Sequence, residues 1–218
     1  VFEAAVATPT NKLLFCDAVT PDGFNDFDLK TEKDNAILAA LNPATFDVFY
    51  FLDEDDAKNN VTANALTDGK YTNAVAFDTK TIYARVHNKN APNACSDVTS
   101  FDVQVTGLPV PQDPTDYVLC DDTTSGSNTD NITQSFKLVD RDSQILGGLI
   151  GYTVTYHTSK SGAENKTDTI DKNINRTVTN SETVYVRVEN DENSACADFS
   201  KELNLVVAPV PIKTFPTW

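Results

Sequence analysis

The chain has 218 residues, 40% of them hydrophobic, and its 32 acidic and 17 basic side chains give a net charge of −15. A field of that sign repels phosphate backbones and anionic lipid headgroups, which disfavours nucleic acid and membrane surfaces as partners. No apolar run is long enough to span a bilayer, so we expect no membrane insertion in this segment. Val, Thr, Asn and Asp are abundant, which favours strands joined by polar turns and predicts an all-β chain.

The first half of the chain shows its elements in a clear order. A first strand ends at Cys16, and apolar residues within 34–41 predict one short helix. Around Tyr50, alternating apolar residues predict a strand that turns Tyr50 inward, and residues 81–88 alternate in the same way. A last strand, residues 100–106, leads into a Pro-rich stretch.

The same order recurs in the second half. Residues 81–88 (TIYARVHN) return as residues 183–190 (TVYVRVEN), and Tyr50 matches Tyr156. Segment 142–148 predicts the second copy of the short helix. The cysteines repeat as well, since Cys16 matches Cys120 and Cys95 matches Cys196. The chain therefore contains two copies of one module that differ by short loop changes.

The repeat fixes the expected domain organisation. We predict repeats over 1–108 and 116–208, a Pro-rich linker over 109–115, and a second linker over 209–218 that leads to a following domain. About seven strands per copy predict two tandem immunoglobulin-like or cadherin-like β-sandwich repeats. No Trp lies between the paired cysteines, so the prediction concerns the architecture and not the immunoglobulin family itself.

Four cysteines without CxxC spacing predict two disulfides and an oxidising compartment outside the cytoplasm, with zinc binding as the alternative. Three pairings are formally allowed. The simplest gives each repeat one intradomain disulfide, Cys16 with Cys95 and Cys120 with Cys196. Such a bond would join the places where the chain enters and leaves a repeat, and would protect the repeat against pulling. Simple stabilisation of a small secreted domain is the alternative role.

Acidic side chains crowd the segments 17–28 and 53–56. Closely spaced carboxylates supply the oxygen ligands that Ca²⁺ prefers, although neither segment has the EF-hand pattern. The second copy keeps the first cluster in part and replaces the second with residues 159–162, SKSG. Solvated turns are the alternative. The candidate Ca²⁺ ligands are Asp17, Asp22, Asp121 and Asp122.

Catalytic signatures are missing from the sequence. The two histidines do not correspond, since His87 aligns with Glu189 and His157 with Phe51, and no GxSxG, HExxH or phosphate-binding glycine loop is present. We therefore expect no enzyme. Glycan binding is the alternative function, because aromatic side chains on the outer face of a sheet can stack on sugar rings. The candidate aromatics are Phe49, Phe51, Tyr83 and Tyr185.

Five segments carry a resemblance to a known family. They are Leu119-Cys-Asp-Asp122, Phe136-Lys-Leu138, Ile145-Leu-Gly-Gly148, residues 152–157, and residues 183–190 followed by Cys196 and a Pro-rich linker. This pattern resembles the repeated domains of giant cell-surface adhesins of Bacteroidota, gliding-motility adhesins among them. The resemblance covers essentially the whole chain, and the second copy is the closer match.

The resemblance implies export by the type IX secretion system, display on the outer cell surface in long arrays, and a role in adhesion or gliding. It implies neighbouring repeats of the same chain as partners, with surface polysaccharide or a substratum as further candidates, and it names no ligand. Asp168-Thr169-Ile170 also looks like the short O-glycosylation motif of these bacteria.

Overall fold

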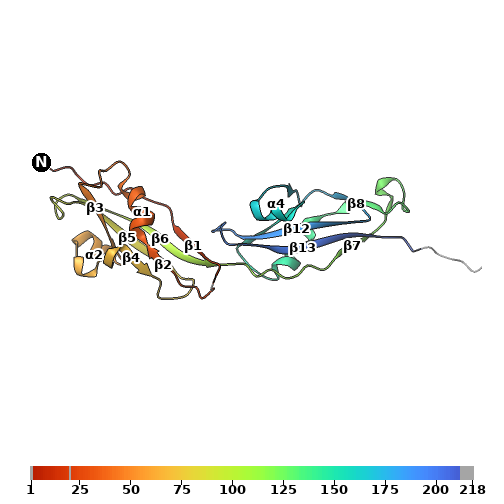
Figure 1. The fold of residues 1–218 in the computed structure, drawn as a ribbon, viewed down its shortest axis with the longest axis horizontal. Coiled ribbons are helices and arrows are strands. Elements are labelled where there is room, and N and C mark those ends of the chain that lie inside the picture. Colours follow the sequence, from red (N-terminus) through yellow and green to blue (C-terminus); the bar gives the residue numbers. More distant parts are fainter. Residues whose placement is uncertain (1, 20, 212–218) are drawn as a thin grey trace, which may run out of the picture. The chain divides into compact units, whose positions relative to one another are not determined.

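The computed structural model describes residues 2–19 and 21–211. The chain divides into two compact units, residues 1–107 and 108–218, here called repeat 1 and repeat 2. Each repeat combines a larger and a smaller β-sheet, so the predicted all-β sandwich is confirmed (Figure 1). Of the predicted linker 209–218, residues 212–218 lie outside the described part of the chain.

In repeat 1 the larger sheet has the strand order β1-β6-β5-β3 and the smaller sheet pairs β2 with β4. The first strand runs parallel to the last, and the other pairs are antiparallel. The elements are β1 (Leu13–Asp17), β2 (Asp26–Asp28), α1 (Leu29–Leu38), β3 (Phe46–Phe51), α2 (Glu54–Asn59), η1 (Thr62–Asn64), η2 (Thr67–Gly69), β4 (Lys70–Thr72), β5 (Thr79–Asn88) and β6 (Ser96–Gly107).

Repeat 2 has the same plan with one added edge strand, in the order β10-β9-β12-β13-β7 beside the pair β11-β8. Its first strand again runs parallel to its last. The elements are β7 (Tyr117–Cys120), η3 (Thr123–Ser125), β8 (Ile132–Phe136), η4 (Leu138–Arg141), α3 (Asp142–Leu146), β9 (Tyr152–His157), α4 (Lys160–Asn165), β10 (Thr169–Ile170), β11 (Arg176–Thr179), β12 (Ser181–Asn190) and β13 (Ala197–Ala208).

The core of each repeat lies between its two sheets, and alternation along the strands supplies its side chains. Tyr50 and Tyr156 are almost fully buried, as predicted from the sequence. One detail of the predicted alternation is wrong, because Phe51, expected on the outer face, is fully buried. Helix α2 starts at Glu54 and packs on strands β3 and β5, which explains why an outward-pointing side chain at the end of β3 is covered.

Helices α1, α2 and α4 begin at residues whose side chains cap the helix by hydrogen bonds, whereas α3 has no such cap. The predicted helices at 34–41 and 142–148 correspond to α1 and α3, and α1 starts five residues earlier than predicted. Helices α2 and α4 were not predicted. The Asp53 carboxylate accepts hydrogen bonds from the backbone N–H groups of Asp55 and Asp56, and the Ser159 hydroxyl accepts one from Gly162. Residues 53–56 therefore form a helix N-terminus, where acidic side chains are favourable.

Candidate functional site

The first cysteine of each repeat lies where the chain leaves that repeat. In the parallel pair β1–β6, Cys16 is opposite Thr106, the second-last residue of β6. In repeat 2, Cys120 is opposite Ala208, the last residue of β13. We call this end of a repeat its downstream pole.

The second cysteine lies at the other end of the same strand, because Cys95 directly precedes β6 and Cys196 directly precedes β13. The incoming chain passes this end of repeat 1, where the Ala7 backbone N–H donates a 2.9 Å hydrogen bond to Asp97. In repeat 2 an ion pair of 2.6 Å joins Asp113 to Lys201, five residues beyond Cys196. We call this end the upstream pole.

The predicted intradomain disulfides are wrong. Eleven residues of extended strand separate Cys95 from Thr106, about 36 Å at 3.3 Å per residue, whereas disulfide-linked Cα atoms lie only about 4.4–6.8 Å apart. The same distance argument applies to repeat 2. In the structure Cys16 and Cys196 are disulfide-bonded, while Cys95 and Cys120 are free thiols. Each predicted pair therefore contains one free cysteine.

A buried arginine holds the loop before Cys196. Arg187, on β12, is 6% exposed. Its Nη1 donates hydrogen bonds to the carbonyl oxygens of Ala163 (3.1 Å) and Glu164 (3.3 Å) in helix α4, and its Nη2 donates to the carbonyl oxygen of Ser194 (3.2 Å). One guanidinium thus ties the sheet, the helix and the cysteine loop together.

Repeat 1 builds the same connection with Arg85, which is 3% exposed. Its Nη1 donates to the carbonyl oxygens of Ala57 and Lys58 at 3.0 Å, and its Nη2 donates to that of Pro92 at 2.9 Å. Burial lowers the pKa of Arg85. The two sites differ at Nε, which in Arg187 donates to Glu189 at 2.9 Å but in Arg85 is buried without a partner.

A matched asparagine fixes the second cysteine itself. The Asn88 backbone N–H donates to the carbonyl oxygen of Cys95 at 3.0 Å, and that of Asn190 donates to Cys196 at 2.9 Å. The side chains of both asparagines accept backbone N–H groups from the loops that follow them. An arginine and an asparagine therefore hold both loops, although Arg85 bonds to the residue three before Cys95 and Arg187 to the residue two before Cys196. No catalytic or binding motif marks these residues in the sequence, although Arg and Asn recur at matching positions in the two copies.

The candidate calcium ligands lie near the first cysteines and act within turns. Asp17 and Asp121 are buried and accept 2.8 Å hydrogen bonds from the backbone N–H groups of Gly23 and Asn131 respectively. Asp22 accepts a backbone N–H at 3.0 Å from within its own turn. These carboxylates close the loops that follow β1 and β7.

Asp122 accepts hydrogen bonds from the side chain and backbone of Thr124 and from the hydroxyls of Thr133 and Ser135. These hydrogen bonds lower the pKa of Asp122 to about 2, and the one from the Thr124 hydroxyl contributes most. Within residues 2–19 and 21–211, no three His, Cys, Asp or Glu side chains gather as a metal site would require. Calcium binding stays a prediction.

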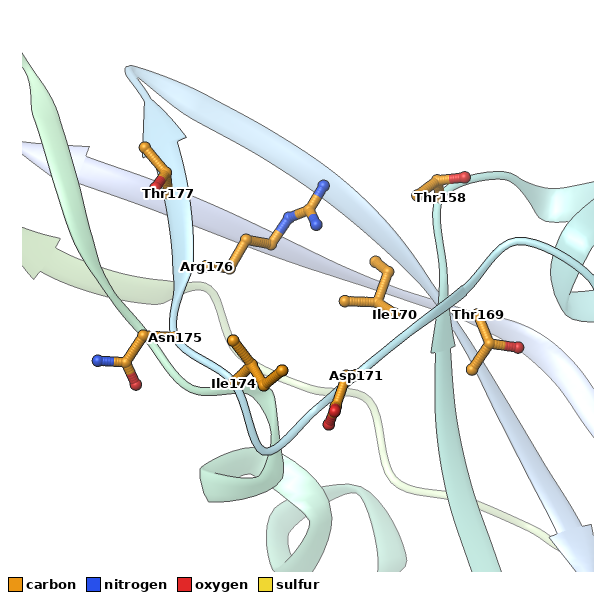
Figure 2. Close-up of a pocket in the computed structure, with 8 residues that line it drawn as sticks. All are labelled: Thr158, Thr169, Ile170, Asp171, Ile174, Asn175, Arg176 and Thr177. Carbon is orange, nitrogen blue, oxygen red and sulfur yellow. The ribbon is translucent and has the colours of Figure 1, made fainter.

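The four candidate sugar-stacking aromatics do not form one exposed platform. Phe51 is fully buried, Phe49 packs on His87 with ring centroids 4.5 Å apart, and Tyr83 and Tyr185 are half-buried. A hollow of about 470 Å³ lies near β10 and β11, where Ile170 and Arg176 reach into the space between the strands (Figure 2). No aromatic side chain lines it, and glycan binding stays a prediction. Its lining residues are Thr158, Thr169, Ile170, Asp171, Ile174, Asn175, Arg176 and Thr177.

The fold and the cysteine positions define a tandem repeat protein of β-sandwich modules that forms disulfides. The chain belongs to the Flavobacterium inter-domain disulphide bond domain family, whose sequence model matches residues 12–109 and 116–211. The description of this family agrees with the finding that the cysteines do not pair inside a repeat. It also fits the predicted origin in Bacteroidota.

Solved structures with tandem immunoglobulin or cadherin domains show only distant similarity. A three-immunoglobulin-domain titin fragment, in an E-to-A mutated variant, is 10% identical over 94% of this chain with a TM-score of 0.31, and the match spans 65% of the titin fragment. Human mucin-like protocadherin EC1-2 is 14% identical over 91% of this chain and 97% of its own, with a TM-score of 0.25. TM-scores this low do not establish a shared fold, so the assignment of the architecture rests on the strand pairing described above.

No curated protein matches the chain. Across the described residues, no helix has both the length and the apolar character needed to cross a membrane. A disulfide persists in an oxidising compartment, which fits an extracellular or secreted protein.

Proposed function

We propose that this segment is a structural and adhesive module of a large extracellular protein, in which a disulfide between Cys16 and Cys196 joins consecutive repeats. One observation carries the proposal: one cysteine of each repeat is disulfide-bonded, and the other is free. Of the two bonded cysteines, Cys16 is the first cysteine of repeat 1 and Cys196 is the second cysteine of repeat 2. The description of the family supports a bond of this kind.

Chain connectivity supports the same pairing. The downstream pole of repeat 1 ends at Gly107, and the incoming segment of repeat 2 is anchored at Asp113 by its ion pair with Lys201. The six residues from Gly107 to Asp113 span at most about 20 Å when fully extended. Cys16 belongs to the downstream pole of repeat 1 and Cys196 to the upstream pole of repeat 2, whereas Cys95 and Cys120 belong to the opposite poles.

Such a bond would change how the chain carries force. It closes a covalent loop that contains residues 17–195, so tension applied to the chain ends would pass only through residues 1–16 and 196–218. The sheets of both repeats would be shielded from pulling. Resistance to pulling suits a stalk that transmits adhesion or gliding forces, and the resemblance to Bacteroidota surface adhesins supports type IX secretion and display on the outer surface. We place the repeats at 1–108 and 116–208.

Single-molecule stretching tests this proposal. The Cys95→Ser/Cys120→Ser double variant removes the free thiols, and its oxidised form should extend only by the residues outside the loop. Adding a reductant, or the further change Cys16→Ser, should release both repeats as two unfolding steps of about a hundred residues each. Two full unfolding steps in the oxidised double variant, together with a peptide map that lacks the Cys16–Cys196 linkage, would refute the proposal.

A further inference from the structure

We infer that the outer face of repeat 2 carries a pocket for one neutral, hydroxyl-rich ligand about as large as a single sugar unit. The pocket is a hollow of about 270 Å³ over strands β9 and β12, bordered by the end of helix α4 and by the edge strand β10. Pockets for drug-sized ligands start at roughly 300 Å³, so this hollow suits one small ligand. Its lining residues all belong to repeat 2, so the inference does not depend on the proposed disulfide.

Aromatic side chains stand at the matching positions of repeat 1. Thr155 and His157 on β9 correspond to Phe49 and Phe51 on β3. Phe51 is fully buried, and the ring of Phe49 packs on His87 with centroids 4.5 Å apart. The same sandwich thus forms with apolar rings at this place, so the fold itself does not require a polar hollow. The polar lining is a property that repeat 2 adds.

The floor of the pocket fixes the direction of its hydrogen bonds. His157 is 1% exposed, and its Nδ1 lies 2.6 Å from the carbonyl oxygen of Thr167, which can only accept. In the neutral ring Nε2 then accepts the hydrogen of the Thr155 hydroxyl at 3.0 Å. The Thr153 hydroxyl donates to Asp191 Oδ1 at 2.6 Å. Both threonine oxygens therefore keep lone pairs that can accept hydrogen bonds from a ligand.

The charges of the pocket are balanced within it. Lys166 Nζ lies 2.8 Å from Glu189 Oε2, and Arg187 Nε donates to the same oxygen at 2.9 Å. With Asp191 the lining holds two cations and two anions, so an ionic ligand would bring a charge that the pocket does not compensate. The ammonium group supplies donors and the carboxylates supply acceptors. Neutral hydroxyl groups, which both donate and accept, match this lining.

The spacing of the hydroxyl groups fits a ring. Thr153 and Thr155 project from the same face of β9, and residues two apart on a strand are separated by about 6.6 Å. Hydroxyl groups on opposite sides of one sugar ring have a similar separation. Thr169 of β10 is paired with His157 and adds a third hydroxyl to the lining. Three hydroxyl groups around one buried histidine can therefore contact several hydroxyls of the same ring.

The test is a titration of the isotope-labelled full chain with the methyl glycosides of glucose, galactose, mannose and N-acetylglucosamine, followed by NMR. We expect at least one of them to give saturable shifts of the backbone amides in 153–157 and 187–191, with a dissociation constant in the millimolar range. Glucuronate, glucosamine and glycine, which carry charges, should bind several-fold more weakly. The inference is overturned if none of the glycosides gives saturable shifts there, or if a charged probe binds equally well or better.

Three variants locate the binding. Thr155→Phe places the residue of repeat 1 in the pocket and should abolish the shifts. Thr153→Val removes one hydroxyl at an exposed position and should weaken binding about fivefold, so it decides the outcome if Thr155→Phe fails to fold. Thr183→Phe is the matched control, because Thr183 projects from the same face of β12 but does not line the pocket, and it should bind like the unchanged chain. Unchanged binding in Thr153→Val, or an equal loss in the control, would place the ligand elsewhere and refute the inference.

Discussion

The hydroxyl group of Tyr156 donates a 2.9 Å hydrogen bond to Asp142 Oδ1 inside repeat 2. Lys172 Nζ lies 2.5 Å from the other carboxylate oxygen of Asp142 and donates at 2.9 Å to the carbonyl oxygen of Val154. Burial raises the pKa of Tyr156 far above its ordinary value, so this side chain remains a donor. The three side chains form a polar cluster between helix α3 and strand β9.

Repeat 1 rebuilds this cluster from a different part of the chain. Tyr50 donates to Asp34 at 2.6 Å, and Lys30 donates at 3.0 Å to the carbonyl oxygen of Val48. Lys30 comes from helix α1, whereas Lys172 follows strand β10. Two unrelated segments thus place a lysine beside a half-buried carboxylate and the same backbone carbonyl position.

Tyr156→Phe should lower the free energy of unfolding of repeat 2 by about 2 kcal/mol, because it removes a hydrogen bond to a charged acceptor within a partly buried cluster. Native-state hydrogen exchange measures the effect and reads each repeat separately. Tyr185→Phe, at a half-buried tyrosine on β12, is the control and should change stability by less than about 0.5 kcal/mol. Equal losses of unfolding free energy in the two variants would show that the polar cluster adds no stability to repeat 2.

Repeat 1 should lose stability when the pH falls below 6.5. His87 is 5% exposed, its Nδ1 is buried without a partner, and its ring packs on Phe49. Burial lowers the pKa of His87 even though Asp47 opposes the shift, and Arg85, Lys30 and Lys89 lower the pKa further.

Near pH 6.5, His87 therefore binds a proton in the unfolded chain but remains neutral in the folded repeat. The free energy of unfolding of repeat 1 then falls as the pH drops, by at most about 1.4 kcal/mol per pH unit. Hydrogen exchange in repeat 1 from pH 7.5 to pH 5 measures this slope. His87→Gln should reduce it, while repeat 2 in the same sample serves as an internal reference. An unchanged slope in the variant would assign the pH dependence to other groups.

Asp53→Ala should destabilise repeat 1 by about 1 kcal/mol through loss of the α2 cap, and Ser159→Ala should do the same in repeat 2 through α4. Each loss should be the same in millimolar Ca²⁺ as in a chelator, because the Asp53 carboxylate and the Ser159 hydroxyl both serve as helix caps. Thermal unfolding under the two conditions decides the matter. A loss for Asp53→Ala that appears only in Ca²⁺ would restore residues 53–56 as a cation site.

Much of the sandwich follows from alternation in the sequence. Residues 81–88 and 183–190 show the period of a strand, and the repeat locates both copies. Helices α2 and α4 are too short to show a helical period, so only their caps mark them in the sequence. Their presence buries Arg85 and Arg187, which alternation alone places on an exposed face.

The cysteine pairing depends on strand direction, which the sequence does not encode locally. If the first strand ran antiparallel to the last, Cys16 would lie near the start of β6 and beside Cys95. Because β1 runs parallel to β6, Cys16 lies beside the end of β6, and the two cysteines of one repeat are separated by the length of a strand. One parallel pairing therefore excludes a disulfide between the two cysteines of repeat 1.

Arg187 should act as a positioning residue for the disulfide of Cys196. Arg187→Met removes the bond from the guanidinium to the Ser194 carbonyl oxygen, so the loop becomes more mobile and the bonded geometry less favoured. In glutathione buffers we expect the equilibrium constant for forming the disulfide to fall roughly tenfold, a shift of about 30 mV in the reduction potential.

Arg85→Met is the matched control, because it removes an equally buried arginine beside the free Cys95. The control should lower the stability of repeat 1 and leave the potential unchanged, and Arg187→Lys should restore part of the shift. Equal potentials in the two Met variants would mean that Arg187 stabilises the sandwich without positioning the cysteine.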